Sequence, residues 1–407
     1  MVEMPSKDSS ESSGTNRGRR TFLKYSGVAA VASLAGCTGG GDGGDGGGDG
    51  GDGGGGDGGD DLTDLEEAAQ NESGQVSWYT SIPVAAGDQV INEFMNRYEG
   101  IVDGVDNVRS GSGEIVSRVN AERESGDLTV DCIHHTQAHT WEQWSRDGFI
   151  MELPEDVVNN EAYPEDLRHP DNHWGPARLF VHNWGLNTNN VDTDAVPTYE
   201  DGLNMDDIVT HAVENYAGEI GWGNYNGSTS VNNFLMHTLN HGDDQFWEWY
   251  EMVLETQPTL FNSGGDTISA NVSGETSITH RNYNYRSNGV MQQGAPHEPR
   301  NPLDMEGNPG RPIQYVPAGV VKDSDVPNSS LLFTKFLLSS DGQKTIQNAY
   351  NGYSFHDPIP VERGENIPSF SEVFNPDWVI LPERSYSNED KIGEIREKAQ
   401  SINNEYL

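Results

Sequence analysis

The apolar and polar positions in the N-terminal half of the chain follow two kinds of period. Short apolar runs that end in turn residues predict strands, and apolar residues at helical spacing predict amphipathic helices. The clearest helical pattern lies between Val90 and Tyr98, and Pro83 is well placed for the first turn of that helix. Strands are predicted at residues 76–80, 104–108 and 128–133, and helices at residues 90–98, 115–121 and within 141–149. This alternation favours an α/β lobe with a mostly parallel sheet.

The pattern becomes less regular after residue 184. A glycine-rich turn at residues 221–230 leads into an apolar run at residues 234–239. Helical spacing returns at residues 331–337, and residues 340–343 have the spacing of a capping box, which predicts the start of another helix. With 407 residues, the chain is longer than one hydrophobic core usually organises, so we expect two lobes.

The charge balance excludes nucleic-acid binding. Lys and Arg number 24 against 65 Asp and Glu, a formal net charge of −41, whereas phosphate neutralisation requires clustered cations. Between Lys24 and Lys322 there is no lysine, and acidic residues occur in every segment. Such a surface is typical of a halophile, because molar salt screens the repulsion between its carboxylates. We interpret the chain as haloarchaeal.

The N-terminal residues are typical of a targeting segment rather than of a fold. Arg19-Arg20 begins a stretch that resembles a twin-arginine export signal, and residues 34–37 resemble a lipobox whose Cys37 carries a lipid. Gly and Asp make up nearly all of residues 38–61, which predicts a solvated, flexible tether. We therefore expect an exported protein, anchored to the outer face of the cell membrane by lipid on Cys37.

The turn Ser112-Gly113-Glu114 opens one of the predicted helices. Free amides and partial positive charge at a helix N-terminus favour a small anion, and glycine lets a ligand approach the backbone. The alternative is that Ser112 only caps its own helix. A second such turn, Ser228-Thr229-Ser230, favours binding, because turns from two lobes could face each other across a cleft.

Tyr283 and Tyr285 are separated by one residue. In an extended segment both phenols would project from one face, about 7 Å apart. Paired phenolates are hard oxygen ligands suited to ferric iron, and phenols also line sugar or carboxylate pockets. Ordinary half-buried tyrosines fit the same pattern.

His135 and His139 have the spacing that would place both imidazoles on one side of a helix, but the segment follows a strand and should be a loop. Thr136 stands where a zinc-hydrolase motif would need its catalytic Glu. A secreted metal-dependent hydrolase is thus the alternative from another class of function. The sequence has no nucleophile elbow, Walker loop or dinucleotide fingerprint. Cys132 lies in a predicted strand and is unrelated to Cys37, so we expect no disulfide.

Several soft motifs, taken in their order and spacing, resemble family 1 extracellular solute-binding proteins of ABC importers, and most of all the branch with ferric-iron-binding proteins. The resemblance runs over about residues 75–360. Its motifs are residues 76–81, residues 109–114 with Arg118 and Ala121-Glu122, and residues 130–131, 187–189, 218–221 and 336–343. It implies a two-lobed α/β fold of the periplasmic-binding-protein type II, with hinge strands between the lobes and the ligand in the interlobe cleft.

The resemblance, together with the N-terminal segment, divides the chain into four parts. These are a signal over 1–36, a tether over 37–74, lobe 1 over 75–180 and 286–345, and lobe 2 with the C-terminal helices over 181–285 and 346–407. The implied function is capture of a small solute and its delivery to a permease in the cytoplasmic membrane, by a monomer that is not an enzyme and has no cofactor. Ferric iron is the slightly favoured cargo, and a phosphonate, sulfate or carboxylate anion is the alternative.

The resemblance also suggests which residues contact the ligand. They are Ser81, Ser112, Gly113, Glu114, Ser228, Thr229, Ser230, Tyr283 and Tyr285. For an iron cargo, Tyr283 and Tyr285 would be the metal ligands and His135 a further candidate. Pro83 stands where ferric members of the family have a histidine.

Overall fold

The computed structural model describes the chain from residue 63 onward, with several gaps. The described residues are 63–158, 163, 165–198, 201–225, 234–235, 237–238, 242–302, 313–350 and 389–407. Cys37, the expected signal and Ser228-Thr229-Ser230 therefore lie outside the described residues. Within those ranges, none of the helices combines the length and the apolar character needed to cross a bilayer.

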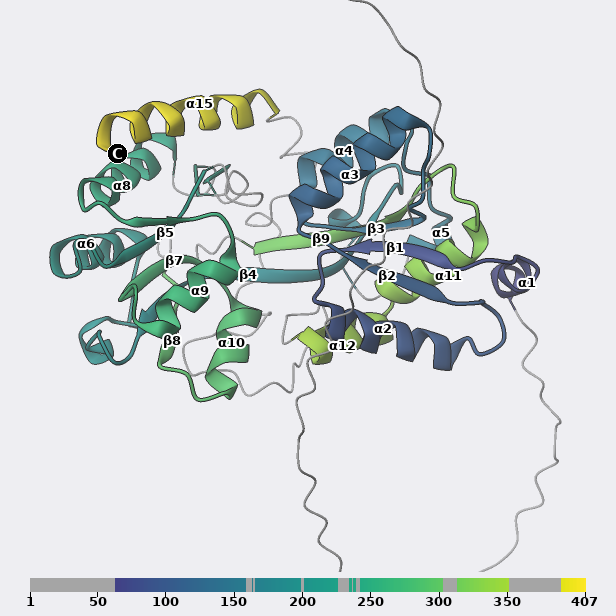
Figure 1. The fold of residues 1–407 in the computed structure, drawn as a ribbon, viewed down its shortest axis with the longest axis horizontal. Helices are drawn as coiled ribbons and strands as arrows, with labels where there is room; N and C mark the ends of the chain where they lie inside the picture. Colours follow the sequence, from purple (N-terminus) through teal and green to yellow (C-terminus); the bar gives the residue numbers. More distant parts are fainter. Residues whose placement is uncertain are drawn as a thin grey trace, which may run out of the picture. The chain divides into compact units, whose positions relative to one another are not determined.

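Three parallel strands form the centre of the first half of the structure (Figure 1). Its elements are α1 (Asp64–Gln70), β1 (Val76–Thr80), α2 (Val84–Arg97), β2 (Val105–Arg109), α3 (Ser112–Ser125), β3 (Cys132–His134), α4 (Ala138–Arg146), α5 (Glu155–Val158), the 3-10 turn Glu165–Leu167, α11 (Pro327–Leu338) and α12 (Ser340–Tyr350). β1 pairs in parallel with β2 on one side and with β3 on the other. The predicted α/β alternation is confirmed.

The long strand β4 (Gly175–Asn187) connects this half of the sheet to the other half, and β9 (Ile313–Val320) lies between β3 and the first part of β4. β9 pairs antiparallel with β3 and with β4 from Gly175 to Val181. From His182 onward, β4 pairs instead with strands of the second half. The partners of β4 thus change next to residue 180, where the resemblance placed a lobe boundary.

The second half continues the sheet in the order β4-β7-β5-β6, and β8 also pairs with β4. Its elements are the 3-10 turn Thr193–Ala195, α6 (Met205–Asn215), β5 (Ile220–Gly223), α8 (Asp243–Glu255), β6 (Thr259–Phe261), α9 (Gly264–Ser273), β7 (Ile278–Tyr283), α10 (Asn284–Gln292), β8 (His297–Arg300) and α15 (Glu389–Tyr406). β7 runs antiparallel to β4, whereas β5 is parallel to both β7 and β6.

Two segments pack with a different half from the one expected. Because β8 pairs with the Trp184–Asn187 end of β4, α10 and β8 belong to the second half, and the chain returns to the first half with β9 rather than at residue 286. α12, which extends beyond residue 345, packs on α2 in the first half.

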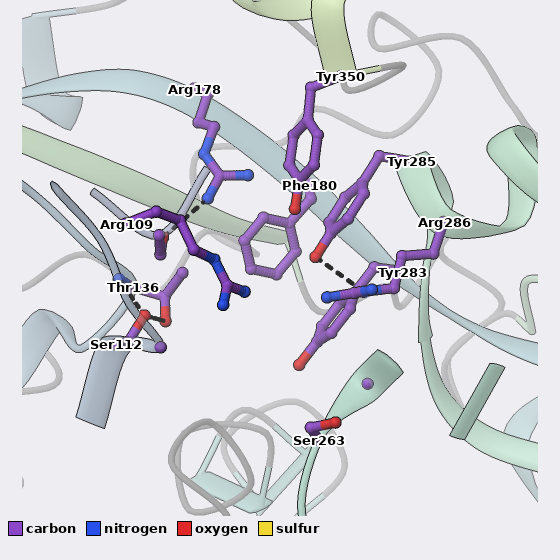
Figure 2. A pocket seen from close by; sticks show the side chains of 13 residues that line it. Arg109, Ser112, Thr136, Arg178, Phe180, Ser263, Tyr283, Tyr285, Arg286 and Tyr350 are labelled. Carbon is purple, nitrogen blue, oxygen red and sulfur yellow. Dashed lines mark hydrogen bonds between the residues drawn. The ribbon is translucent and has the colours of Figure 1, made fainter. Parts of the chain in front are cut away.

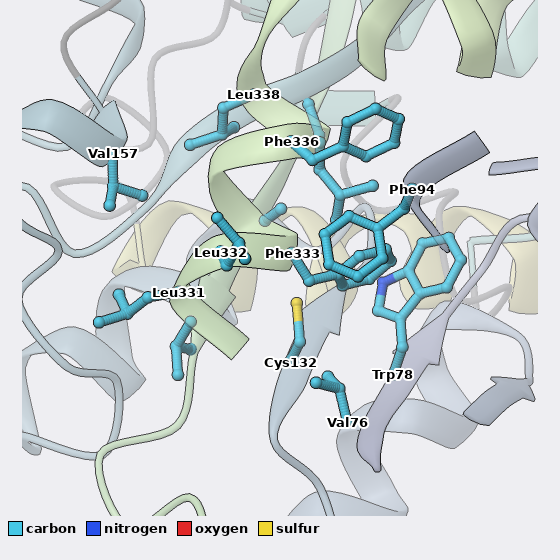
Figure 3. Packing of buried hydrophobic residues seen from close by; sticks show 14 of the residues in the cluster. Val76, Trp78, Phe94, Cys132, Val157, Leu331, Leu332, Phe333, Phe336 and Leu338 are labelled. Carbon is cyan, nitrogen blue, oxygen red and sulfur yellow. The ribbon is translucent and has the colours of Figure 1, made fainter. Parts of the chain in front are cut away.

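Apolar side chains pack on both faces of the first half of the sheet. In β1, Trp78 belongs to the cluster on one face and Tyr79 to the cluster on the other. The Trp78 ring meets the edge of Phe333 from α11 with centroids 5.2 Å apart, and Phe333 meets Phe94 from α2 at 4.9 Å (Figure 3). The strand alternation that predicted β1 therefore also distributes its side chains between two cores.

The residues just before β1 are folded, although the expected tether extended to residue 74. Ala69 of α1 is buried, and α1 packs on α11. The carboxylate of Glu72 accepts hydrogen bonds from the Asn328 and Ser329 amides at the start of α11, at 2.9 and 2.8 Å. A carboxylate at a helix N-terminus satisfies unpaired amides and complements the helix dipole, so this segment is held to the body of the protein.

Three local expectations differ from the structure. β3 begins at Cys132 rather than at residue 128, because the Thr129 amide donates to the Glu122 carboxylate instead of to a strand, at 3.0 Å. α12 is capped by the Ser339 hydroxyl, which accepts from the Gly342 amide at 3.1 Å, one residue before the expected cap. His139 lies in α4 rather than in a loop.

Candidate functional site

A cavity of about 120 Å³ is lined by residues from both halves of the structure (Figure 2). The lining residues are Ser81, Arg109, Gly111, Ser112, Thr136, Arg178, Phe180, Ser263, Gly264, Tyr283, Tyr285, Arg286 and Tyr350. Since a water molecule in the liquid occupies about 30 Å³, this space equals that of about four waters. The cavity therefore suits a small solute, and its described lining contains arginines but no Asp or Glu.

The start of α3 faces the cavity from the first half. Its N-cap is Gly111, whose carbonyl accepts the first intrahelical hydrogen bond, from Ile115 at 2.9 Å. The Ser112 hydroxyl does not cap this helix: it accepts from the Thr136 amide at 3.2 Å and lies 2.8 Å from the Thr136 hydroxyl. The two hydroxyls are therefore bonded to each other at the wall of the cavity.

The start of α9 lines the cavity from the second half. The Ser263 hydroxyl caps α9 by accepting from the Asp266 amide at 3.1 Å, so the amides of Gly264 and Gly265 precede the capped position. A Cβ on Gly264 would lie 2.4 Å from Cε2 of Tyr283. Only glycine leaves room for the Tyr283 ring to lie against the start of this helix. The phenol and the positive end of the helix dipole therefore meet at the same site.

Arg178 is the most deeply buried cation of the cavity, with 4% of its surface exposed. Its Nη2 donates to the Ser81 hydroxyl at 3.1 Å and its Nε donates to Nε2 of His134 at 3.4 Å. Both partners are neutral acceptors. A buried guanidinium without a counter-charge is costly, and an anion in the cavity would compensate it.

Arg109 and Arg286 complete a set of three cations around the cavity. Arg286 donates from Nε to the Tyr285 hydroxyl at 3.2 Å, and Arg109 points from the end of β2 toward the same space (Figure 2). Among the described residues, none of the three arginines has a carboxylate within ion-pair distance. Other arginines do pair with carboxylates, namely Arg97, Arg118, Arg123, Arg146, Arg168 and Arg300. In a strongly acidic chain, three arginines without a carboxylate partner in the described ranges make this cavity locally cationic.

Three tyrosines stack along one wall of the cavity. The Tyr283 and Tyr285 rings are parallel with centroids 5.7 Å apart, and Tyr350 stacks on Tyr285 at 4.2 Å. The expected pair in one strand is wrong, because Tyr283 ends β7 and Tyr285 lies in the first turn of α10. Burial, and then the neighbouring Tyr350, raise the pKa of Tyr285, so its hydroxyl stays protonated at neutral pH. The Tyr285 oxygen accepts from Arg286, and its hydroxyl also hydrogen-bonds the Tyr350 side chain, so the phenol is held at the cavity wall.

Comparison with known proteins is informative only at the level of structure. No family model matches the sequence. No curated protein matches it either. The structure is similar to iron-bound HitA from Pseudomonas aeruginosa, with a TM-score of 0.60, 15% identity, and coverage of 78% of this chain and 99% of HitA. It is also similar to the periplasmic binding protein AfuA from Actinobacillus pleuropneumoniae with bound fructose-6-phosphate. That match has a TM-score of 0.62 and 15% identity, and it covers 82% of this chain and 98% of AfuA. A third similar structure is a substrate-binding protein of an ABC transporter from Agrobacterium tumefaciens. That match has a TM-score of 0.66 and 12% identity, and it covers 82% of this chain and 95% of that protein.

The chain has the two-lobed fold of periplasmic binding proteins. This bears out the expected fold class, and all three structures are covered over nearly their whole length. In this binding-protein fold, β4 is the strand shared between the lobes.

Four of the residues expected to contact the ligand line this same cavity: Ser81, Ser112, Tyr283 and Tyr285. Gly113 and Glu114 are not among its lining residues. Glu114 is exposed, and its carboxylate accepts from the Gly111 amide at 3.1 Å, so it closes the turn before α3. The expected N-cap role of Ser112 is not observed, because Gly111 occupies that position.

His135 lies away from the cavity, in the core of the first lobe. Its ring stacks on Trp141 with centroids 5.1 Å apart, and its Nδ1 accepts from the Gln137 amide at 3.0 Å. Burial, and then His139, lower the pKa of His135 to about 3. The described part of the chain contains no group of three or more His, Cys, Asp or Glu residues placed to hold a metal.

The arginines and the start of α9 were missed as site residues, although the sequence carries signals for both. Arg178 interrupts the otherwise apolar run at residues 177–181, an unusual place for a charge. Ser263-Gly264-Gly265-Asp266 follows a strand, as Ser112-Gly113-Glu114 does, and resembles that turn in composition. A search for lone cations in apolar strands and for repeated glycine-rich helix starts would have found them.

Proposed function

We propose that the chain is the solute-binding protein of an ABC importer and that its solute is a small anion. The observation that carries the proposal is the set of three arginines around the cavity, without a carboxylate partner among the described residues. The starts of α3 and α9 line the same cavity and add backbone donors. A phosphonate, sulfate, phosphate or short carboxylate is small enough for a cavity of about 120 Å³.

Ferric iron, the slightly favoured cargo from the sequence, is the competing ligand. HitA is an iron-bound structure, whereas AfuA holds a phosphorylated sugar, so the fold accommodates both kinds of solute in other proteins. In this chain a bare trivalent cation would be repelled by three guanidinium groups. Coordination through Tyr285 would also require its phenol to ionise, which burial opposes. The site chemistry therefore supports the anion over the metal ion.

The N-terminal segment supports export and membrane attachment. We propose that residues 1–36 direct twin-arginine export, that the lipid on Cys37 anchors the mature protein, and that residues 38–61 act as the tether to the folded body. The partner would be a permease in the cytoplasmic membrane. A Cys37→Ser variant should be released into the medium, and an Arg19→Lys, Arg20→Lys variant should remain in the cytoplasm.

The anion proposal is tested by thermal unfolding and calorimetry at molar KCl, with phosphate, sulfate, methylphosphonate, citrate and ferric ion as separate probes. At 100 times its Kd, a ligand that binds only the folded state stabilises it by about 2.7 kcal/mol. Arg178→Met should abolish the response to the anion that binds. Arg97→Met is the control, because Arg97 pairs with Asp341 away from the cavity at an exposed site. Binding of ferric ion alone, or an anion response unchanged in Arg178→Met, would refute the proposal.

A further inference from the structure

The charge of Arg178 is oriented by neighbours that do not neutralise it. Of the five N–H donors of its guanidinium, one binds the Ser81 hydroxyl and one binds His134, which leaves three for a ligand. A carboxylate at the position of His134 would also fix the guanidinium, but it would cancel the charge that attracts an anion. A neutral imidazole acceptor orients the cation and preserves its charge.

We propose that His134 is a positioning residue of the anion site, whose neutral ring holds the Arg178 guanidinium toward the cavity. This inference rests on the proposed function. His134 does not line the cavity itself and acts through Arg178, the group that would contact the anion.

The hydrogen bonds of His134 define its tautomer. Nε2 accepts from Arg178, so the ring proton is on Nδ1, which lies 3.0 Å from the Thr80 hydroxyl oxygen. That oxygen also accepts from the Ile82 amide at 3.2 Å, so two donors fix it. Burial, followed by the charge of Arg178, lowers the pKa of His134 well below its ordinary value. The ring is therefore neutral in the folded protein at physiological pH.

The strands around His134 bury its ring completely. His134 lies in β3 between β1 and β9, fully buried, and its ring stacks on Trp78 at 6.0 Å. The charged and titratable groups that act on it are Arg178 from β4 and His135 beside it in the chain. β4 has a register shift between Pro176 and Arg178, and such bulges redirect side chains next to functional sites. The bulge and the hydrogen bond to His134 together orient the Arg178 guanidinium toward the cavity.

Two substitutions separate this role from simple packing. His134→Leu introduces an apolar side chain of similar size and removes the hydrogen-bond acceptor. It should weaken binding of the anion probe at least tenfold, which is about 1.4 kcal/mol. His134→Gln places a carbonyl oxygen at about the position of Nε2 and should restore affinity to within about threefold. His135→Phe is the matched control, because it changes an equally buried neighbour while keeping the stack on Trp141.

The readouts are calorimetric titration with phosphate, sulfate and methylphosphonate, and nitrogen NMR of the ligand-free protein. We expect an unprotonated Nε2 on His134, and an Arg178 Nε proton that exchanges slowly in the wild type and rapidly in His134→Leu. Wild-type affinity in His134→Leu, or a proton on Nε2, would overturn the inference. If none of the anions binds the wild type, the proposed function fails, while the Arg178 proton exchange in His134→Leu still decides whether His134 holds the guanidinium.

Discussion

Mild acidification should destabilise this fold through its buried histidines. Burial is the main cause that lowers the pKa of His135 to about 3, of His182 to about 3 and of His297 to about 4, from an ordinary value of 6.5. Burial also lowers the pKa of His134. Because these pKa values are lower in the folded state, the unfolded chain binds more protons below pH 6.5. Stability therefore falls as the pH falls from 6.5 toward the folded pKa values.

The size of the effect follows from the linkage relation. A pH of 5 is 1.5 units below the unfolded histidine pKa of 6.5 and still above the three folded pKa values. Each of these histidines therefore lowers the free energy of unfolding by about 1.5 × 1.36, or about 2 kcal/mol. His135, His182 and His297 together cost about 6 kcal/mol, and His134 adds to this. That is comparable to the whole stability of many proteins, about 5–15 kcal/mol. Carboxylates, with ordinary pKa values near 4, remain mostly ionised at pH 5 and offset little of it.

The assay is urea unfolding at molar KCl, at pH 7 and at pH 5, with tryptophan fluorescence as the signal that monitors unfolding. His135→Phe removes one titrating group while keeping the ring stack, so the stability difference between the two pH values should shrink by about 2 kcal/mol. Stability that is unchanged or higher at pH 5, or a pH difference equal in wild type and His135→Phe, would refute the reasoning.

Three substitutions test other parts of the structure. Gly264→Ala places a methyl group against the Tyr283 ring, so it should weaken anion binding at least tenfold in calorimetry with a loss of stability of about 1–3 kcal/mol. Glu72→Ala removes the carboxylate that binds the Ser329 amide, and the urea midpoint should report a loss of about 1–3 kcal/mol with anion affinity unchanged. Phe333→Ala opens a cavity in the core cluster and should cost about 3–5 kcal/mol in the same assay.

The elements of the first lobe could be predicted because their periods are local. The strand at residues 76–80 and the helix that ends near Tyr98 follow from side-chain alternation and helical spacing, which the folded structure keeps. The boundaries that failed depend on distant partners. β3 starts late because the Thr129 amide donates to Glu122, and α1 is ordered because Glu72 binds the start of α11. Such contacts between remote residues leave no trace in a periodic pattern.

The candidate site was predicted only in part for the same reason. Ser112 and Tyr283 carry local signals, a helix start and a paired phenol, and the structure brings them to one cavity. The interpretation of the tyrosines changed because their neighbours Arg281 and Arg286 donate to the phenol oxygens, at 3.3 and 3.2 Å. These arginines place both phenols in a cationic setting, which supports the proposed anion, whereas the sequence spacing alone was equally consistent with phenolate ligands for iron.

A cationic cavity in a chain of net charge −41 raises the question of how an anion approaches it. In dilute buffer, the Debye length of about 30 Å would let carboxylates across the whole surface repel the ligand. At molar salt that length falls to about 3 Å, so distant carboxylates are screened while arginines in contact with the ligand still act on it. Arg178, 4% exposed, is shielded from the salt more than any surface charge. An acidic surface and a cationic site are therefore compatible at molar salt, the condition expected of a halophile, and they would conflict in dilute buffer.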